Sequence, residues 1–437
     1  MLNFFVILFG KAFISLSKLL NLGNGSTWPG HIALNLNSNF VKDLLRSNPR
    51  GRKLKALIIA GTNGKTTTGK LITEILRSNG NSVIENASGA NLLNGLASAI
   101  IKGSSLFDSA RPGLAVLKQD YLIFETDENA LPQVLNETNA DYVICLNLFR
   151  DQLDRYGEID SIAKKWHSSF EKLGPNTTLI LNADDPQIAY LADGIKAKTL
   201  YFGLSEKGND KTLHGADSTH CPKCLEKLEF ETVFFSHLGI WKCPNCKLKR
   251  PTTDIEELSQ YPLEGKYNKY NALAASLFAT NESIGQDKIT ISFNNFTPAF
   301  GRQEKLTYKG KNVQIFLSKN PTSFNESLST VKDLKGKDLL ILLNDRIPDG
   351  LDVSWIWDIN FEEILNKEFN VGVSGDRVYD MALRLKYAEQ FTHIDPDPKV
   401  MLNKMVEALK SDETLYILPN YSAMLDIRKI LTGRKIL

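Results

Sequence analysis

The chain has 437 residues, of which 42% are apolar, enough to bury more than one hydrophobic core, so an intrinsically disordered protein is excluded. Five cysteines are too few for a secreted disulfide framework of this length, which favours a cytosolic protein. The 52 basic and 50 acidic residues give a net charge of +2, which excludes the dense basic field of non-specific nucleic-acid binding.

The N-terminal segment is apolar from Leu2 to Phe9 apart from Asn3, and it is followed by Lys11 and Lys18. It is shorter than the roughly 20 residues that span a bilayer. A secretory signal would place its positive charge before the apolar residues, so this pattern does not indicate one. Two interpretations stay open: an amphipathic helix packed on its own domain, or a helix over residues 1–22 that lies on a membrane surface or on a partner.

From residue 54 onward, short apolar, β-branched runs alternate with helical patterns, which is typical of a doubly wound parallel α/β sheet. Strands are predicted over Leu54–Ala60, Tyr121–Phe124, Asp141–Asn147, Thr178–Asn182 and Thr199–Phe202, and helices over Lys65–Arg77, Ser161–Leu173 and Asn268–Ala279. The rhythm breaks over Ser205–Pro251, a lysine-rich stretch that we interpret as an insertion.

A second α/β series begins after about residue 300. It comprises predicted strands over Lys337–Leu343, Val371–Val373 and Leu415–Leu418, with helices over Arg377–Ala388 and Val400–Lys410. We therefore expect an N-terminal segment over 1–50, a central domain over 51–300 with an insertion at about 205–251, and a Rossmann-like C-terminal domain over 301–437.

A glycine-containing turn connects the first predicted strand to the helix that follows it. Its residues are Gly61, Thr62, Asn63, Gly64, Lys65, Thr66 and Thr67. Such a turn directs backbone N–H groups and the positive end of the helix at an anion. Lys65 is suited to reach the outer phosphates and the Thr66 hydroxyl to bind Mg²⁺. The spacing is shorter than the general G-x4-GK[ST] pattern, but it still predicts a nucleotide site.

Four cysteines form two CxxC pairs inside the insertion. Cys221, Cys224, Cys243 and Cys246 have the spacing C-x2-C-x18-C-x2-C, which lies within the range of four-thiolate zinc sites. Four thiolates close the zinc tetrahedron and leave no position for water or substrate. We therefore predict a structural Zn²⁺ that folds a zinc ribbon.

Several segments, taken in order, resemble the Mur ligases, the ATP-dependent amide-forming enzymes of peptidoglycan precursor synthesis. The loop GTNGKTTT at 61–68 resembles their ATP loop, and NADDP at 182–186 and KNP at 319–321 resemble later family segments. The resemblance implies that Glu125, at a strand end, is an acidic partner of Mg²⁺. It also implies that Asn268 and Asn271 contact the nucleotide and that Arg302 contacts the γ-phosphate.

The sequence departs from the Mur pattern at three positions. Gln152 and Tyr267 replace histidines of the family, and Phe316 replaces an aspartate. The change at Gln152 leaves a second metal site open. Lys165 aligns with a lysine that some members carbamylate, and the alternative is an ordinary solvated helix lysine.

A narrower group, the MurT family, fits these departures. The segments 147–158 and 349–355 and the four-cysteine insertion resemble this family, whose members are the synthetase subunits of lipid II isoglutaminyl synthase. The resemblance implies that the chain lacks the UDP-binding first Mur domain. It further implies that ATP phosphorylates the α-carboxylate of D-glutamate in lipid II, and that ammonia then forms D-isoglutamine. Neutralisation of charge by Lys65, Arg302 and Mg²⁺ would supply most of the catalysis.

The ammonia needs a separate glutaminase. Release of ammonia from glutamine usually requires an activated Cys-His pair, but four cysteines are assigned to metal and Cys145 lies in an apolar strand. The family resemblance implies a GatD glutaminase as partner. It also implies that Asp349, or next Asp352, orients the histidine of that partner; the alternative is that Asp349-Gly350 is only a turn.

Two other functions remain as alternatives. One is a Mur or folylpolyglutamate ligase that adds an amino acid, and a requirement for an amino-acid nucleophile would indicate it. The other is an ATP-regulated zinc-ribbon module that binds nucleic acid, against which the low net charge argues. With lipid II as substrate, we expect a cytoplasmic protein at the inner face of the membrane.

Overall fold

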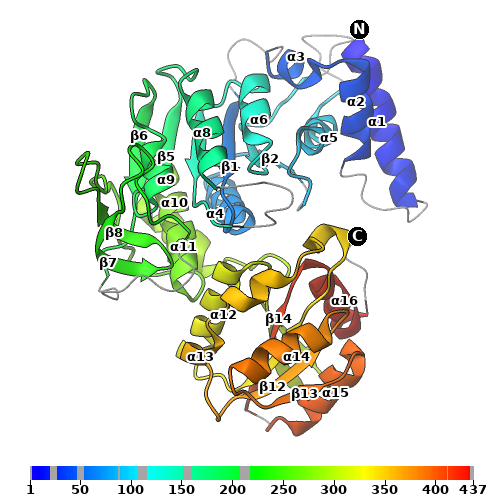
Figure 1. Cartoon of the computed structure of the whole chain (residues 1–437). Helices are drawn as coiled ribbons and strands as arrows, with labels where there is room; N and C mark the ends of the chain where they lie inside the picture. Colours follow the sequence, from blue (N-terminus) through cyan, green and yellow to red (C-terminus); the bar gives the residue numbers. More distant parts are fainter. Residues whose placement is uncertain are drawn as a thin grey trace.

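Two six-stranded sheets form the framework of the protein (Figure 1). The computed structural model describes residues 2–19, 27–46, 54–86, 89–106, 116–150, 159–206, 217–410 and 412–433. The predicted α/β fold class is confirmed, because both sheets are mainly parallel and have helices on both faces. Figure 1 shows the two sheets as successive lobes, with the C-terminal lobe below.

The first sheet is entirely parallel and has the strand order β2-β3-β1-β4-β5-β6. Its strands are β1 (Lys55–Ala60), β2 (Val83–Glu85), β3 (Tyr121–Glu125), β4 (Tyr142–Cys145), β5 (Thr178–Asn182) and β6 (Lys198–Phe202). One face packs on α4 (Lys65–Ser78), α10 (Lys266–Asn281) and α11 (Gln286–Asn294). The other packs on α5 (Leu93–Gly103), α6 (Leu131–Glu137), α8 (Ile159–Phe170) and α9 (Pro186–Tyr190). Apolar residues alternate along each strand between these two cores, as in a sheet that is buried on both faces.

The second sheet has the order β13-β12-β11-β14-β10-β9 and is parallel except for the β9–β10 hairpin. Its strands are β9 (Arg302–Tyr308), β10 (Lys311–Phe316), β11 (Asp338–Leu342), β12 (Asn370–Ser374), β13 (Thr392–Ile394) and β14 (Thr414–Pro419). The covering helices are α12 (Pro321–Asp333), α13 (Phe361–Ile364), α14 (Val378–Tyr387), α15 (Pro398–Ala408) and α16 (Tyr421–Thr432). Two short 3₁₀ turns, η1 (Ile347–Asp349) and η2 (Ser354–Asp358), follow β11.

The insertion between β6 and α10 contains an antiparallel hairpin of β7 (Glu229–Phe235) and β8 (Leu238–Lys242). The four predicted ligand cysteines flank this hairpin, two before β7 and two after β8. Trp241, which is almost fully buried, donates from its indole nitrogen to the Ala183 carbonyl at 3.1 Å. The ribbon is thus attached to the end of β5.

Three helices precede the first sheet: α1 (Leu2–Leu19), α2 (Trp28–Leu36) and α3 (Phe40–Arg46). Val6, Ile7 and Ile14 of α1 join the apolar core that α5 shares with the first sheet. The structure therefore supports the interpretation of an N-terminal helix packed on its own domain. Among the described helices, none has both the length and the apolar character needed to cross a membrane.

Most predicted elements agree with the structure to within two or three residues at each end. The predicted helix over Lys65–Arg77 is observed as Lys65–Ser78, and the strand over Thr178–Asn182 has the predicted bounds. The elements that the sequence reasoning missed include α5, the β9–β10 hairpin and the helices α11, α12 and α16. The sequence reasoning also predicted a strand over Asp141–Asn147, whereas the observed strand ends at Cys145. Leu146 and Asn147 are buried and still hydrogen-bond to the backbone of Ala60 and Thr62, but they lie outside the strand.

Candidate nucleotide site and metal site

The glycine-containing loop between β1 and α4 has the geometry of a phosphate loop. Gly61 has φ +140° and Gly64, at the N-cap of α4, has φ +93°, a conformation that favours glycine. A Cβ atom added at Gly64 would lie 2.1 Å from Asn271 Oδ1, so the loop also needs glycine for space. The loop residues from Thr62 onward and the first turn of α4 line the cavity described below.

Lys65 follows this loop and folds back along it. Its ammonium donates to the carbonyl oxygens of Gly61 and, at 3.4 Å, of Thr62. It also lies 3.7 Å from the buried carboxylate of Glu128. These contacts hold a positive charge at the mouth of the loop, where outer phosphates of a nucleotide would lie.

Thr66 and Glu125 meet beyond the carboxyl ends of β1 and β3, where the sequence predicts a magnesium site. The Thr66 hydroxyl donates to Glu125 Oε2 at 2.6 Å, because β1 and β3 are adjacent parallel strands. Burial raises the pKa of Glu125, against the opposing effects of the Thr66 hydrogen bond and the Arg302 charge. Hydroxyl and carboxylate oxygens suit Mg²⁺, so this pair fits the predicted ion in chemistry and position.

The two asparagines of α10 have different positions. Asn271 lines the cavity and accepts a hydrogen bond from the Thr68 hydroxyl at 3.3 Å. Asn268 lies behind it: its Oδ1 accepts from Asn271 Nδ2 at 3.2 Å, and its own amide donates to the Glu264 carbonyl. Asn271 is therefore placed to contact a ligand, whereas Asn268 orients Asn271.

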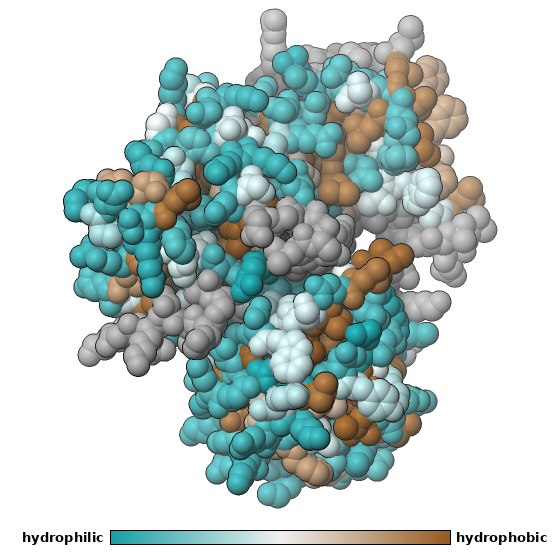
Figure 2. Space-filling view, in the orientation of Figure 1, coloured by the Kyte–Doolittle hydropathy of each residue, from teal (hydrophilic) through white to brown (hydrophobic). Residues whose placement is uncertain are grey.

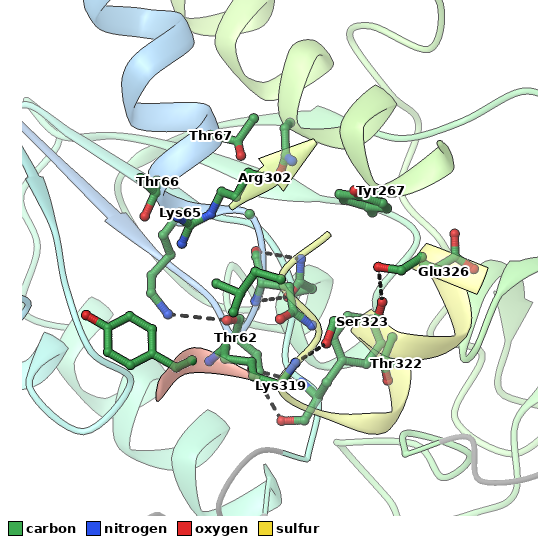
Figure 3. A pocket seen from close by; sticks show the side chains of 18 of the residues that line it. Thr62, Lys65, Thr66, Thr67, Tyr267, Arg302, Lys319, Thr322, Ser323 and Glu326 are labelled. Carbon is green, nitrogen blue, oxygen red and sulfur yellow. Dashed lines mark hydrogen bonds between the residues drawn. The ribbon is translucent and has the colours of Figure 1, made fainter. Parts of the chain in front are cut away.

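Arg302 enters the same cavity from the start of β9, in the second lobe (Figure 3). Burial lowers the pKa of Arg302, while the charge of Glu125 acts in the opposite direction. Figure 3 shows Arg302 beside Lys65 and Thr67, so two cations from distant parts of the sequence lie near the loop.

The cavity has a volume of about 370 Å³ and is walled by both lobes. The second lobe contributes the first turn of α12, whose cap residue Asn320 donates to Asn63 Oδ1 at 3.3 Å across 257 residues of sequence. Further lining residues are Asp127, Asn147, Phe149, Phe235, Phe316, Lys319, Thr322, Ser323 and Tyr421.

Three carboxylates that line this cavity, those of Asp127, Glu128 and Glu326, were missed by the sequence reasoning. Asp127 and Glu128 follow the predicted strand end at Glu125 by two and three residues, and that proximity could have identified them. Glu326 lies one turn into α12, and no local signal indicates its position. Burial raises the pKa of Glu326 to about 7, partly offset by the charge of Lys266.

The three departures from the Mur pattern fall in different places. Tyr267 and Phe316 both line the cavity, and the Tyr267 hydroxyl accepts a hydrogen bond from Gln303 at 3.1 Å. Gln152 lies outside the described residues. The Lys165 side chain is exposed on α8 and is not among the cavity-lining residues, which is consistent with a solvated helix lysine.

The four cysteines of the ribbon converge on one point. All four sulfurs lie within 4.8 Å of one another, and the Cys221–Cys246 and Cys224–Cys243 pairs are both at 3.5 Å. Four sulfurs bound tetrahedrally at about 2.3 Å from zinc would be about 3.8 Å apart. The cluster therefore fits a closed, structural zinc site.

A buried ion pair holds the end of the ribbon on the first sheet. Arg250 Nε donates to Asp184 Oδ1 at 2.6 Å, and its Nη2 donates to the Leu204 carbonyl at 3.0 Å. Asp184 also accepts from the Tyr270 hydroxyl at 2.7 Å. Burial raises the pKa of Asp184 to about 6, even though the charge of Arg250 lowers it.

The aspartates assigned to the partner's site lie outside this cavity, around η1 and η2. The half-buried Asp349 accepts hydrogen bonds from the backbone N–H of Ser422, at 2.9 Å, and from its hydroxyl. The exposed Asp352 accepts from the backbone N–H of Ser354 at 2.8 Å. Asp349 is thus held in a fixed orientation at the surface of the second lobe.

Comparison with known proteins shows similarity along nearly the whole chain. Residues 59–279 match the Mur ligase middle domain and residues 317–424 match the MurT ligase C-terminal domain. The chain is 31% identical to the lipid II isoglutaminyl synthase (glutamine-hydrolyzing) subunit MurT of Streptococcus pneumoniae, over 96% of this chain and 95% of the relative. It is also 31% identical to the corresponding subunit of Staphylococcus aureus, over 84% of this chain and 83% of that one.

Comparison with solved structures identifies similar folds. A pseudomurein peptide ligase type C from Methanothermus fervidus has a TM-score of 0.67 and 21% identity, and the match covers 92% of this chain and 84% of that chain.

Proposed function

The chain belongs to the MurT family, and we propose that it is the ATP-dependent ligase subunit of a lipid II isoglutaminyl synthase. The observation that carries the proposal is the convergence of the phosphate loop, Lys65 and Arg302 on one cavity between the lobes. An amino-acid-adding ligase and a nucleic-acid-binding module are not favoured, since the relatives that are 31% identical and match over most of both chains are MurT subunits.

The proposed reaction has two steps. The carboxylate oxygen of D-glutamate in the lipid II stem peptide attacks the γ-phosphorus of ATP, which forms an acyl phosphate and releases ADP. Ammonia then attacks the acyl carbon, so that phosphate leaves, a proton is released and D-isoglutamine remains. Lys65 and Arg302 would neutralise the charge that develops on the transferred phosphoryl group.

Mg²⁺ and Zn²⁺ would have separate roles. Thr66 and Glu125 would hold Mg²⁺, which when bound offsets the charge of the nucleotide phosphates. The four ribbon cysteines would hold Zn²⁺ and fold the ribbon. We also propose that the central domain extends over 51–300 and the C-terminal domain over 301–437.

The proposed source of ammonia is a separate glutaminase subunit of the GatD type. All five cysteines lie within the described part of the chain, and four of them form the ribbon cluster. Cys145 is fully buried in β4, and burial raises its pKa far above that of a reactive thiol. We place the complex in the cytoplasm, at the inner face of the membrane that holds lipid II.

Asp349 is our first candidate for the group that orients the partner's histidine, and Asp352 is the second. Asp349 is favoured because Ser422 fixes its carboxylate, whereas Asp352 only caps the turn that follows it. A fixed carboxylate is what the orientation of an imidazole requires.

The first experiment measures the ATP-dependent mass change of lipid II. The chain is combined with its glutaminase partner and glutamine, or with ammonium salt alone. Amidation lowers the substrate mass by about one unit, as a hydroxyl becomes an amino group. Lys65→Met should abolish both reactions, whereas Lys165→Met, which removes an exposed lysine, should leave both intact. ATP hydrolysis without amidation in either reaction would refute the proposed substrate.

A second experiment separates the aspartates. Asp349→Asn should abolish the glutamine-dependent reaction but leave the ammonium-dependent reaction unchanged, because its effect is confined to the partner's site. Asp352→Asn is the matched control, and it should leave both reactions intact. Loss of ammonium-dependent activity in Asp349→Asn would contradict the assignment, since the residue would then act in ligation or folding.

A further inference from the structure

One face of α1 is apolar and exposed. Leu2, Phe5, Leu8, Phe9, Phe13 and Leu16 are 41–68% exposed. At about 100° per residue, these positions span roughly 140° of the helix circumference. The rest of the helix circumference is fixed to the protein by the buried residues Val6, Ile7 and Ile14. The exposed residues are therefore held in place on a docked helix.

The helix α2 extends this surface. Trp28, Ile32 and Leu36 follow one another at four-residue intervals and are 65%, 44% and 58% exposed. Figure 2 shows brown side chains gathered at the upper right, over the place of α1 and α2 in Figure 1. Large contiguous apolar patches on soluble proteins indicate interaction sites. We call these nine exposed residues of α1 and α2 the apolar face.

The charge of the surrounding sequence indicates what the apolar face binds. Residues 1–53 contain seven lysines and arginines but one acidic residue, Asp43, so their net charge is +6. Because the whole chain has a net charge of +2, the remaining residues have −4. A segment that combines excess positive charge in its sequence with exposed aromatic and aliphatic side chains is typical of segments that bind anionic lipid headgroups. This excess of positive charge therefore favours an anionic membrane over a protein as the partner of the apolar face.

The apolar face is connected to the cavity by one rigid helix. α2 packs closely on α5, where the Gly30 N–H donates to Ser98 Oγ at 2.9 Å and a Cβ at Gly30 would clash with the Asn94 carbonyl. The N-cap of α5, Leu92, lines the cavity. An 11-residue helix is about 16 Å long. A surface held by α1 and α2 would therefore lie close to the substrate cavity.

We propose that the apolar face of α1 and α2 binds the surface of an anionic bilayer and so holds the cavity near lipid-linked substrate. Its use for catalysis rests on the proposed function, but lipid binding itself does not. In this arrangement the apolar side chains enter the headgroup region, and the excess positive charge of residues 1–53 attracts the protein to anionic lipids. The protein lies on the membrane without crossing it.

The test is co-sedimentation of the full chain with vesicles of phosphatidylcholine and phosphatidylglycerol in equal parts, without nucleotide or lipid II. The variant Phe9→Glu/Phe13→Glu should lower vesicle affinity at least about tenfold, since two aromatic anchors are lost and two repelled charges are added. The matched control Ile291→Glu/Val400→Glu adds the same charges at exposed apolar positions of α11 and α15. Its vesicle affinity should fall much less. Circular dichroism verifies that both variants fold.

A second readout depends on Trp28. Lipids brominated near the headgroup should quench its fluorescence in the bound protein. Trp28→Phe should remove most of that quenching, since Trp166 and Trp241 are buried and Trp355 and Trp357 lie in η2 of the second lobe, away from α1 and α2. Equal vesicle binding by the Phe9/Phe13 variant and its control would overturn the proposal. Absence of vesicle binding, with a dimer that the Phe9/Phe13 variant dissociates, would assign the face to a second copy of the chain and would also overturn it.

Activity assays keep this proposal distinct from the proposed function. The Phe9/Phe13 variant should amidate a water-soluble, short-chain analogue of lipid II normally, and lose activity on lipid II in vesicles. If the wild-type chain amidates neither substrate, the proposed function fails, and vesicle binding still decides the role of the apolar face.

Discussion

The buried ion pair between Arg250 and Asp184 should make the stability of the protein depend on pH in a defined way. Arg250 is 12% exposed in its side chain and Asp184 is fully buried, so Arg250→Met leaves a buried carboxylate without its cation. Removal of one partner of such a pair costs about 3–5 kcal/mol when the other remains charged. Methionine keeps most of the apolar volume of the arginine stem, so the loss reports mainly on charge.

The size of this loss should fall at low pH. The folded-state pKa of Asp184 is about 6, above its usual 3.8, so its contribution to stability is complete below pH 3.8 and is lost as pH rises through 6. The difference between the usual pKa of 3.8 and the folded-state pKa of about 6 corresponds to about 3 kcal/mol of stability. In Arg250→Met the folded-state pKa rises further, because the cation that lowers it is gone. At pH 5 the carboxyl is then neutral and the substitution should cost only about 1–2 kcal/mol, the value of the lost hydrogen bonds.

Urea denaturation at pH 5 and pH 8 measures both values. Arg77→Met is the matched control, because Arg77 is 48% exposed and its pair with Glu85 lies at the surface. The control should cost less than about 1 kcal/mol at either pH. If Arg250→Met costs the same at pH 5 and pH 8, the ionised pair is not what holds the ribbon, and the reasoning is refuted.

Three further predictions concern the cavity and the ribbon. Gly64→Ala should lower ATP affinity at least about tenfold in calorimetric titration, because the new Cβ displaces Asn271 and strains the loop; Gly80→Ala, with similar φ but nothing within 4 Å, should not. Cys243→Ser should abolish the binding of one zinc per chain, measured by mass spectrometry of the native protein, and lower the melting temperature, whereas Cys145→Ser should retain zinc. Glu326→Gln should be more stable than wild type at pH 8 by up to about 3 kcal/mol and equal to it near pH 4.5, because the wild-type contribution is lost as pH rises through a folded-state pKa of about 7. A constant difference between pH 4.5 and pH 8 in urea denaturation would contradict that last expectation.

The parts of the site that are local in sequence could be predicted from it. The loop from Gly61 to Thr67 is determined by a strand, a short turn and a helix, so its pattern of residues is sufficient to identify it. The four cysteines are likewise identified by spacing, because two CxxC turns at this separation are typical of a four-thiolate zinc site. Glu125 follows from its place at the end of a strand next to β1.

The rest depends on packing between segments that are distant in the sequence. Nothing near Gly64 indicates that Asn271 limits the space beside it. Glu326 is one of several acidic residues on amphipathic helices, and only the docking of α12 against the first lobe buries it. The helix α5 was missed because its sequence is apolar on most sides and has no side-chain cap, so it lacks the signals that mark a helix start.

The charges around the cavity explain why both lobes are needed for the proposed chemistry. Lys65 and the first turn of α4 belong to the first lobe, and Arg302, Lys319 and the first turn of α12 belong to the second. Two helix N-termini and three cations thus face one space, which favours a polyanion there. Glu128 and Glu326 lie in the same space, and the raised pKa of Glu326 reduces its repulsion of a phosphate near neutral pH. Since the Asn320–Asn63 hydrogen bond joins the two lobes at the loop itself, a change in how the lobes meet would move Arg302 relative to Lys65.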